Sequence, residues 1–243
     1  MRAWSVTYDT GFVTAGHTTH KPFDPDVVDK EMHVIRNELL CDAVRITGGD
    51  ADRLELAANS AADAGLEVWY CPFTNGLTQD ELLAFILDAA QRAERVRRRG
   101  GRVVLVTGSE LSLFTDGFIP GETLEQRVAV LTDPVRLRTV LPQLQDAVNG
   151  FLARAILQAR QRFTCPITYA SLPHEGVDWT PFDLAPSDAV YRDANNASRF
   201  RETIRAATAH DRLFAVTEFG CTTYRGAAEL GARSEEIIEP TGG

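Results

Sequence analysis

The sequence predicts an α/β protein, a (β/α)8 TIM barrel that is incomplete or atypical at its eighth β/α unit. Short apolar runs alternate with amphipathic helical segments along the chain, which is typical of βα units and a parallel sheet. The 243 residues are close to the ~250 of one such barrel, so we expect a single domain over residues 1–243. Two of the apolar runs end on a glutamate, which is where a parallel barrel carries the side chains of its mouth.

The first half of the chain contains regular strand–helix alternations with clear helix boundaries. Asp24 and Asp50 each stand directly before a helical segment, as N-cap residues do, and Gly65 follows the second helix as a C-terminal stop. Thr78 and Glu81 have the spacing of a capping box at the start of the third helix. We therefore predict strands over residues 3–8, 43–47, 66–70 and 102–107, and helices over residues 25–40, 51–64 and 78–99.

The second half of the chain is less regular. Residues 115–131 contain glycine and proline and only a short apolar pattern, so we predict a long βα loop above the barrel mouth. A long helix is expected over residues 134–162, with Pro142 and Gly150 as candidate interruptions. Three further strands are expected at residues 167–170, 189–191 and 213–217, with a helix at residues 197–210.

The eighth β/α unit has no convincing counterpart. After residue 226 the chain contains a short alanine-rich piece and the segment 234–243. An open parallel sheet exposes strand edges, which is costly unless something covers them. Three alternatives remain open: residues 236–239 close the gap poorly, another subunit of a homo-oligomer covers it, or the barrel is partial.

Composition narrows the classes of function. The net charge of -9 argues against a nucleic acid or an anionic membrane as partner, because both call for a basic surface. The four cysteines contain no Cys-x-x-Cys pair, so we expect free thiols rather than a zinc framework. The N-terminal residues lack the pattern of a signal peptide and no apolar run approaches ~20 residues, so we expect a cytoplasmic protein.

Glu110 and Glu218 are the leading candidates for chemistry. Each follows an apolar run, and the two runs are expected to be strands four and seven. These strands lie on opposite sides of an eight-stranded barrel, so inward-pointing residues at their ends can face each other across the mouth. Cleavage of a glycosidic bond with retention requires two carboxyl groups roughly 5–5.5 Å apart, one protonated and one ionised. Either glutamate alone is more simply explained as a surface or ion-paired carboxylate, and it is the matched pair that favours catalysis.

The motifs Gly108-Ser109-Glu110 and Thr217-Glu218-Phe219-Gly220 resemble those of the clan A retaining glycoside hydrolases, the TIM-barrel 4/7 superfamily. The resemblance implies that Glu110 is the acid/base and Glu218 the nucleophile. The chain departs from the family at Ser109, where an asparagine usually hydrogen-bonds the sugar 2-hydroxyl, and the family's aromatic platform from strand eight has no evident counterpart. The segments Glu-Leu-Ser-Leu-Phe and Phe-Gly-Cys-x-Thr-Tyr-Arg-Gly are more loosely similar to actinobacterial abortive-infection proteins.

Several other side chains are candidates for substrate binding. Arg45 lies inside an apolar strand, where a charge must be paired. It could keep Glu218 ionised, as the strand-two arginine of the resembled family does, or it could form a structural ion pair with a helix. Tyr191 could hydrogen-bond Glu218 or pack as a core aromatic residue. The remaining candidates lie near strand ends or in mouth loops, with packing as the alternative for each aromatic ring: Tyr8, Trp69, Ser109, Tyr169, His174, Trp179 and Tyr224.

The sequence thus predicts a retaining O-glycosidase or transglycosidase that acts on a small carbohydrate or glycoside and needs neither a metal nor an organic cofactor. One alternative is a catalytically inactive, glycosidase-derived protein for carbohydrate binding or assembly, which Ser109 and the missing eighth strand motivate. Another is a metal-dependent barrel enzyme that uses His17 and His20, which stand three apart in a loop with Asp9 nearby.

Overall fold

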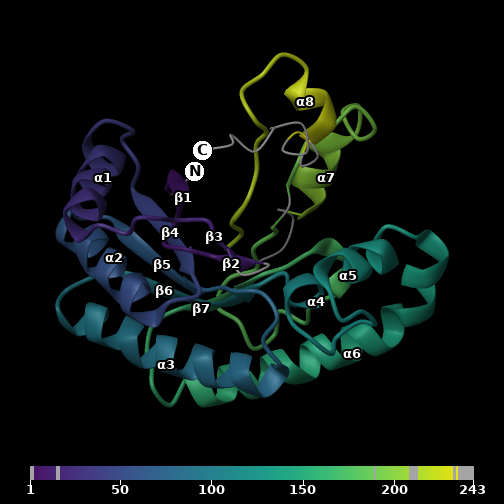
Figure 1. Ribbon diagram of the computed structural model, residues 1–243, viewed down its shortest axis with the longest axis horizontal. Helices are drawn as coiled ribbons and strands as arrows, with labels where there is room; N and C mark the ends of the chain where they lie inside the picture. Colours follow the sequence, from purple (N-terminus) through teal and green to yellow (C-terminus); the bar gives the residue numbers. More distant parts are fainter. Residues whose placement is uncertain (1–2, 15–16, 189, 208–212, 232–233, 235–243) are drawn as a thin grey trace.

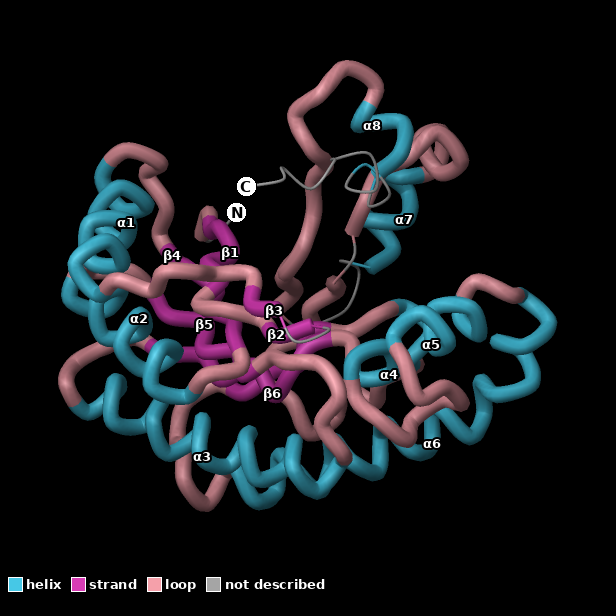
Figure 2. Tube along the Cα trace, in the orientation of Figure 1, coloured by secondary structure: helices cyan, strands magenta, loops and turns pink. Residues whose placement is uncertain are grey.

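The structure is a computed structural model that describes residues 3–14, 17–188, 190–207, 213–231 and 234. Its main strands are β1 (Ser5–Asp9), β4 (Ala43–Gly48), β5 (Glu67–Pro72), β6 (Val103–Ser109) and β7 (Ile167–Ala170). They form a five-stranded sheet in the order β1-β4-β5-β6-β7, in which every neighbouring pair is parallel (Figures 1 and 2). The predicted α/β class with a parallel sheet is therefore confirmed, and each of these strands overlaps a predicted one.

The longer helices follow the strands along the chain and line the outer side of the curved sheet (Figure 1). They are α1 (Pro25–Asn37), α2 (Ala51–Asp63), α3 (Gln79–Arg98) and α6 (Pro134–Ala159). The predicted caps are confirmed: Asp24 accepts a hydrogen bond from the backbone of α1, Asp50 does so from α2, and Thr78 and Glu81 form the capping box of α3. Helix α6 continues through Pro142 as one element, so this proline does not interrupt it.

The two faces of the sheet carry different side chains. Val44, Ile46 and their neighbours on the same face belong to the main core, together with buried residues of the outer helices. On the other face, Cys71, Val106 and Ala170 form a small second cluster against which Trp69 packs. Because strand residues alternate between faces, and because Arg45 is in register with Trp69, Arg45 lies on this second face. We call it the inner face, and the face that packs against the helices the outer face.

Two further segments extend the order of the sheet through isolated bridges. Residues 184–190 run parallel to residues 213–219, through the bridges Leu184–Leu213, Ser187–Val216 and Val190–Phe219. The Asp188 amide donates to the Ser171 carbonyl just beyond β7, so residues 184–190 lie beside β7 and residues 213–219 come next. Of the predicted strands 189–191 and 213–217, the structure thus has isolated bridges at residues 190, 213 and 216, and residue 189 lies outside the described residues.

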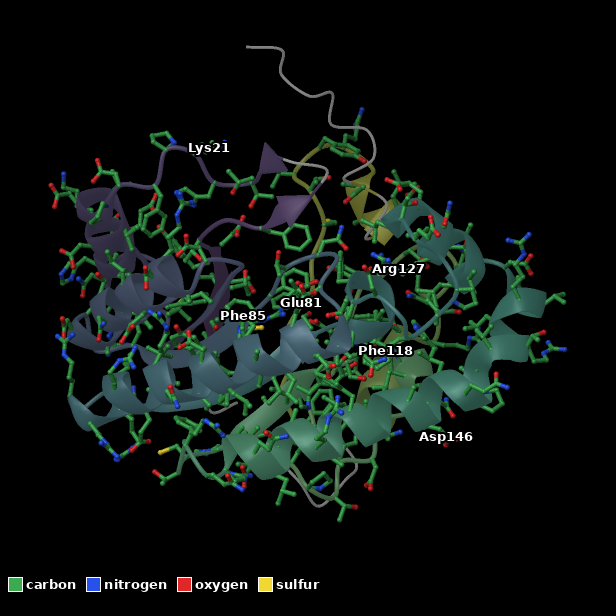
Figure 3. All side chains as sticks on the ribbon, turned by 60° about the horizontal axis from the view of Figure 1, so that its bottom comes forward. Lys21, Glu81, Phe85, Phe118, Arg127 and Asp146 are labelled. Atoms are coloured by element: carbon green, nitrogen blue, oxygen red, sulfur yellow. The ribbon has the colours of Figure 1, made fainter. Side chains whose placement is uncertain are left out.

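The prediction of an irregular loop over residues 115–131 is wrong for its second half. This part forms helix α5 (Leu124–Leu131), and a short helix α4 (Leu111–Phe114) precedes the loop. The Thr123 side chain caps α5 by accepting the Gln126 amide. The buried guanidinium of Arg127, labelled in Figure 3, donates to the Leu113 carbonyl over 2.6 Å and so attaches α5 to α4. This tertiary contact stabilises a helix that is too short to be evident from local sequence.

The remaining elements are short. In the loop after β1, β2 (Val13–Thr14) pairs antiparallel with β3 (His17–Thr18). A 3-10 turn, η1 (Pro173–Glu175), follows β7, and α7 (Phe200–Ala207) and α8 (Ala227–Leu230) flank the 213–219 segment in sequence. Helix α7 lies within the predicted helix 197–210, whose last residues are outside the described part, as is the candidate closing segment 236–239. Within the described residues, no strand pairing joins 213–219 to β1. None of the described helices combines the length and apolarity needed to cross a membrane.

Candidate active site

Arg45 is the central side chain of the site. It is 3% exposed in the fully buried strand β4, so its charge must be compensated by neighbours. One terminal nitrogen donates to the Ser109 hydroxyl over 2.9 Å, and the other lies 3.3 Å from Glu218 Oε1 and 3.4 Å from Asp188 Oδ1. These partners come from the ends of β6 and of the segments 213–219 and 184–190. Arg45 therefore joins strand ends around the inner face of the sheet, rather than pairing with an outer helix.

Glu218 is held from two sides. Tyr191 donates its hydroxyl proton to Oε2 over 2.8 Å, while Arg45 contacts Oε1. Of the two alternatives for Tyr191, the structure has the hydrogen bond to Glu218. Burial and the charge of Asp188 raise the pKa of Glu218, and the contacts with Arg45 and Tyr191 oppose this rise. With both oxygens held by donors, the Glu218 carboxylate has a defined orientation in its ionised form.

Glu110 follows β6 in an uncommon backbone conformation. Its φ of 48° and ψ of 50° lie in the left-handed region, and its amide donates to the Ala170 carbonyl at the end of β7 over 2.9 Å. Its side chain does not cap α4, which leaves the carboxyl group free for other contacts. Burial, followed by the charges of Asp188, Glu218 and Glu175, raises the pKa of Glu110 to about 8. This carboxyl group is therefore protonated at neutral pH.

The two glutamates meet a third carboxylate, Asp188. One carboxyl oxygen from each of Glu110, Asp188 and Glu218 lies within 4.8 Å of the other two. Asp188 is fully buried and accepts hydrogen bonds of 2.7 Å from the hydroxyls of Ser109 and Thr217. It stabilises the buried Arg45 charge, and through Ser109 and Thr217 it connects the ends of β6 and of segment 213–219.

Sequence reasoning missed Asp188. The residue stands directly before the short apolar run predicted as strand six, and that run was too short to indicate which of its neighbours faces inward. The available signal was an acidic residue at the boundary of a predicted strand, the same pattern that singled out the two glutamates.

The cluster also contains the donor atoms that a divalent cation accepts, namely carboxylate oxygens. Glu110, Asp188 and Glu218 are the one group of three potential metal ligands within the described residues. Two of these carboxylates already contact the Arg45 guanidinium, which provides positive charge there. At the other predicted metal position, Nδ1 of His20 lies 2.8 Å from the Asp9 carbonyl oxygen, and the side chain of His17 lies outside what the structure describes.

Of the predicted substrate-binding residues, the structure brings Arg45, Ser109 and Tyr191 to the carboxylates, and it places Trp69 on the same face of the sheet. Trp69 packs against the cluster of Cys71, Val106 and Ala170, and its indole nitrogen donates to Glu67 over 3.0 Å. The Ser109 hydroxyl donates its one proton to Asp188 and accepts a hydrogen bond from Arg45.

The other predicted residues have partners away from the carboxylate cluster. Tyr8 and Tyr169 face the outer helices and belong to the main core. Tyr8 donates to Glu31 of α1, and Tyr169 donates to Glu175. The remaining contacts are those of His174 with the Ser112 hydroxyl, of Trp179 with the Phe182 ring, and of Tyr224 with the Ser234 carbonyl.

Neither a scan against models of known protein families nor a search of curated proteins found a match to this chain.

Proposed function

We propose that this protein is a glycoside hydrolase-like enzyme that cleaves or transfers a glycosidic bond with retention of anomeric configuration. The observation that carries the proposal is the approach of the Glu110 and Glu218 carboxyl groups, which have oxygens within 4.8 Å of each other. Retaining glycosidases place their two carboxyl groups about 5–5.5 Å apart, whereas inverting enzymes need about 6.5–9.5 Å to admit a water molecule. The short separation favours the retaining reaction.

The surroundings of the two groups support different roles. Glu110, with a pKa raised to about 8, is a proton donor at neutral pH and suits the general acid. Glu218 accepts hydrogen bonds from Arg45 and Tyr191, both of which favour its ionised form, and it suits the nucleophile. This pairing of a protonated and an ionised carboxyl group is what the first step of a retaining mechanism requires.

The proposed reaction has two steps. Glu218 attacks the anomeric carbon and forms a glycosyl ester, while Glu110 gives its proton to the departing glycosidic oxygen. Formation of the ester removes the negative charge of Glu218, and this charge is one cause of the raised pKa of Glu110. The pKa of Glu110 therefore falls, and its carboxylate can now take a proton from the water or sugar hydroxyl that attacks the ester. The ester bond breaks, the product keeps the original configuration, and Glu218 is ionised again.

The implied substrate is a small carbohydrate or glycoside. Trp69 lies on the same sheet face as Arg45 and offers an aromatic surface on which a sugar ring can pack. The two-step reaction needs neither a metal nor an organic cofactor, because both carboxyl groups belong to the chain.

The architecture beyond the parallel sheet is part of the same proposal. We propose that the described strands belong to a TIM barrel with an atypical eighth unit, in a single domain over residues 1–243. A second copy of the chain would then cover the edge between β1 and residues 213–219, and the enzyme would act in the cytoplasm. The parallel continuation of the sheet order through residues 184–190 and 213–219 supports the barrel.

Variants of the two glutamates test the reaction. Glu218→Gln removes the nucleophile and is expected to lower turnover of aryl glycosides by at least about a thousandfold. Glu110→Gln is expected to lower turnover ~10²–10⁴-fold for poor leaving groups, and much less for good leaving groups that depart without a proton. Glu94→Gln serves as the control, because Glu94 is a buried glutamate paired with Arg97 and Arg98 at the end of α3. Near-native turnover of any aryl glycoside by Glu218→Gln, or of poor leaving groups by Glu110→Gln, would refute the assigned role.

A second candidate function is sugar binding without catalysis. The observation that favours it is the Ser109 hydroxyl, which gives its one proton to Asp188 and therefore cannot donate a hydrogen bond to a sugar 2-hydroxyl. Calorimetric titration with the sugars of the aryl glycoside panel distinguishes the two functions. Binding without turnover would favour the binding protein, and turnover that depends on both glutamates would favour the enzyme.

A further inference from the structure

A buried pair of side chains lies behind Glu110, on the outer face of the sheet. Tyr169 of β7 is fully buried, and its hydroxyl oxygen accepts the Leu111 amide over 2.8 Å. The same hydroxyl donates its proton to Glu175 Oε2 over 2.7 Å. The hydroxyl thus connects the residue after Glu110 to a carboxylate of η1.

Glu175 is also fully buried, and its two oxygens accept from several donors. Oε1 accepts the Ser112 amide over 2.9 Å, and Oε2 accepts the Leu172 amide over 3.0 Å as well as the Tyr169 hydroxyl. Such a set of donors is what a buried carboxylate requires. His174 does not provide a compensating charge, because burial lowers the pKa of its imidazole, which contacts the Ser112 hydroxyl.

This arrangement explains how Glu110 keeps its left-handed backbone. The first amides of a helix have no partner within the helix, and here they follow a residue that lacks the freedom of glycine. Tyr169 accepts the first amide of α4 and Glu175 accepts the second. Together with the Glu110–Ala170 bond, these contacts fix the backbone on both sides of Glu110. Strained backbone persists where its surroundings over-determine it, as they do here.

We infer that Tyr169 and Glu175 are positioning residues, which hold the backbone of Glu110 so that its carboxyl group stays beside Glu218. The catalytic meaning of this inference rests on the proposed glycosidase function. The structural statement, that two outer-face side chains set the conformation of an inner-face carboxyl group, stands on the hydrogen bonds alone.

The electrostatic surroundings give the inference a specific signature. The charged groups that act on Glu110 are Asp188, Glu218 and Glu175, which raise its pKa after the larger effect of burial, and Arg45, which lowers it. Glu175 is the one of the three acidic groups whose carboxylate lies outside the Glu110–Asp188–Glu218 cluster. Removal of the Glu175 charge is therefore expected to lower the pKa of Glu110 without loss of any group in that cluster.

The experiment uses the full chain with Glu175→Gln and Tyr169→Phe. Carboxyl ¹³C NMR of glutamate-labelled protein measures the titration of Glu110, with Glu110→Gln to assign the signal. We expect Glu175→Gln to lower the pKa of Glu110 by on the order of half a unit. We expect Tyr169→Phe, which keeps the Glu175 charge, to lower kcat on aryl glycosides about tenfold with little change in KM, because Glu110 is displaced. We also expect this variant to change the pKa of Glu110, because the displaced carboxyl group moves relative to Asp188 and Glu218.

Matched controls separate positioning from loss of stability. Tyr70→Phe removes the hydroxyl of another buried tyrosine on the same face, which has no hydrogen-bond partner within the described residues. Glu94→Gln removes a buried carboxylate at the far end of α3. Both controls should leave the titration of Glu110 and the value of kcat unchanged.

The outcomes distinguish the inference from the proposed function. A lowered Glu110 pKa in folded Glu175→Gln, in a protein with no glycosidase activity, would keep the positioning network and reject the glycosidase. An active enzyme in which Glu175→Gln leaves the Glu110 titration unchanged would overturn the inference. If Glu175→Gln does not fold, Tyr169→Phe decides alone. In an active enzyme, a kcat equal to that of Tyr70→Phe would overturn the inference. In an inactive protein, an unchanged Glu110 titration in Tyr169→Phe would overturn it.

Discussion

The Tyr191 hydroxyl donates a hydrogen bond of 2.8 Å to Glu218, from a segment that lies beside the Glu218 segment in the sheet and 27 residues before it in the chain. Arg45 contacts the second oxygen of the same carboxylate from β4. The two donors come from different parts of the sheet, so the orientation of Glu218 depends on how the strands are assembled. Single substitutions of these donors therefore test whether they orient and ionise Glu218.

Tyr191→Phe should impair the proposed nucleophile. The Tyr191 hydroxyl lowers the pKa of Glu218, so its loss raises that pKa further and reduces the ionised fraction at low pH. We expect kcat/KM to fall about tenfold and the acidic limb of its pH profile to move to higher pH. The pH dependence of aryl glycoside hydrolysis measures both effects. Tyr70→Phe is the matched control, and an unmoved acidic limb in Tyr191→Phe would contradict the role assigned to the hydroxyl.

Activity should decline on the alkaline side because of Glu110. The proposed general acid is functional only while protonated, and the pKa of Glu110 is raised to about 8. We expect kcat/KM to decrease as the pH rises through about 8 and the decrease to be absent from Glu110→Gln when a good leaving group makes the acid unnecessary. A profile measured with leaving groups of graded acidity tests this. An alkaline limb that persists in Glu110→Gln would assign the ionisation to another group.

The same carboxyl group should make stability depend on pH. The folded-state pKa of about 8 lies above the ~4.3 of an unfolded glutamate, so between these values the folded protein binds more protons than the unfolded chain. The free energy of unfolding therefore falls as pH rises through this window. Between pH ~5 and pH ~8, the wild type should lose ~1–3 kcal/mol more than Glu110→Gln loses. Urea unfolding at both pH values measures the difference, and equal losses would show that Glu110 ionises normally.

Asp188→Asn should destabilise the protein strongly. The change removes a carboxylate 3.4 Å from the buried Arg45 guanidinium, which then keeps Glu218 as its one acidic partner among the described residues. We expect a loss of about 3 kcal/mol or more. Asp63→Asn is a matched control, because Asp63 lies at the same 3.4 Å from Arg99 but both side chains are more than half exposed. That control should cost less than about 1 kcal/mol. Similar losses in the two variants, measured by urea unfolding, would contradict the central role of the buried pair.

A chelator should leave turnover unchanged. In the proposed reaction the carboxylates act directly on the sugar, and Arg45 supplies the positive charge near Asp188 and Glu218. We expect the rate of aryl glycoside hydrolysis after prolonged dialysis against EDTA to equal that of untreated protein. Addition of Mg²⁺, Mn²⁺ or Zn²⁺ should not increase this rate. Loss of activity with metal-dependent recovery would favour the metal-dependent barrel instead.

Local sequence patterns predicted most of the elements that build the sheet. Asp24, Asp50 and the Thr78–Glu81 box cap their helices as expected, because capping depends on residues within one turn of each other. Arg45 lies on the inner face and contacts Glu218, which is one of the two alternatives that the sequence left open for it. Helix α5 was missed because its stability comes from the buried Arg127, a contact that connects separate turns of the chain.

The predicted aromatic residues show where local patterns stop being sufficient. Tyr8 is in register with Ile46 and therefore shares the outer face, whereas Trp69 is in register with Arg45 and shares the inner face. Both residues stand near strand ends in sequence. Which face each one takes depends on strand register, since a shift by one residue moves a side chain to the opposite face.

The sequence by itself determined the alternation of strands and helices, the helix boundaries and the two acidic strand ends, because these depend on residues close together in the chain. Only the tertiary structure decided that Asp188 joins Glu110 and Glu218, that Glu175 stands behind Glu110, and that burial raises the pKa of Glu110 to about 8. The physical reason is that desolvation and charge–charge interactions depend on distances in space between groups that are far apart along the chain.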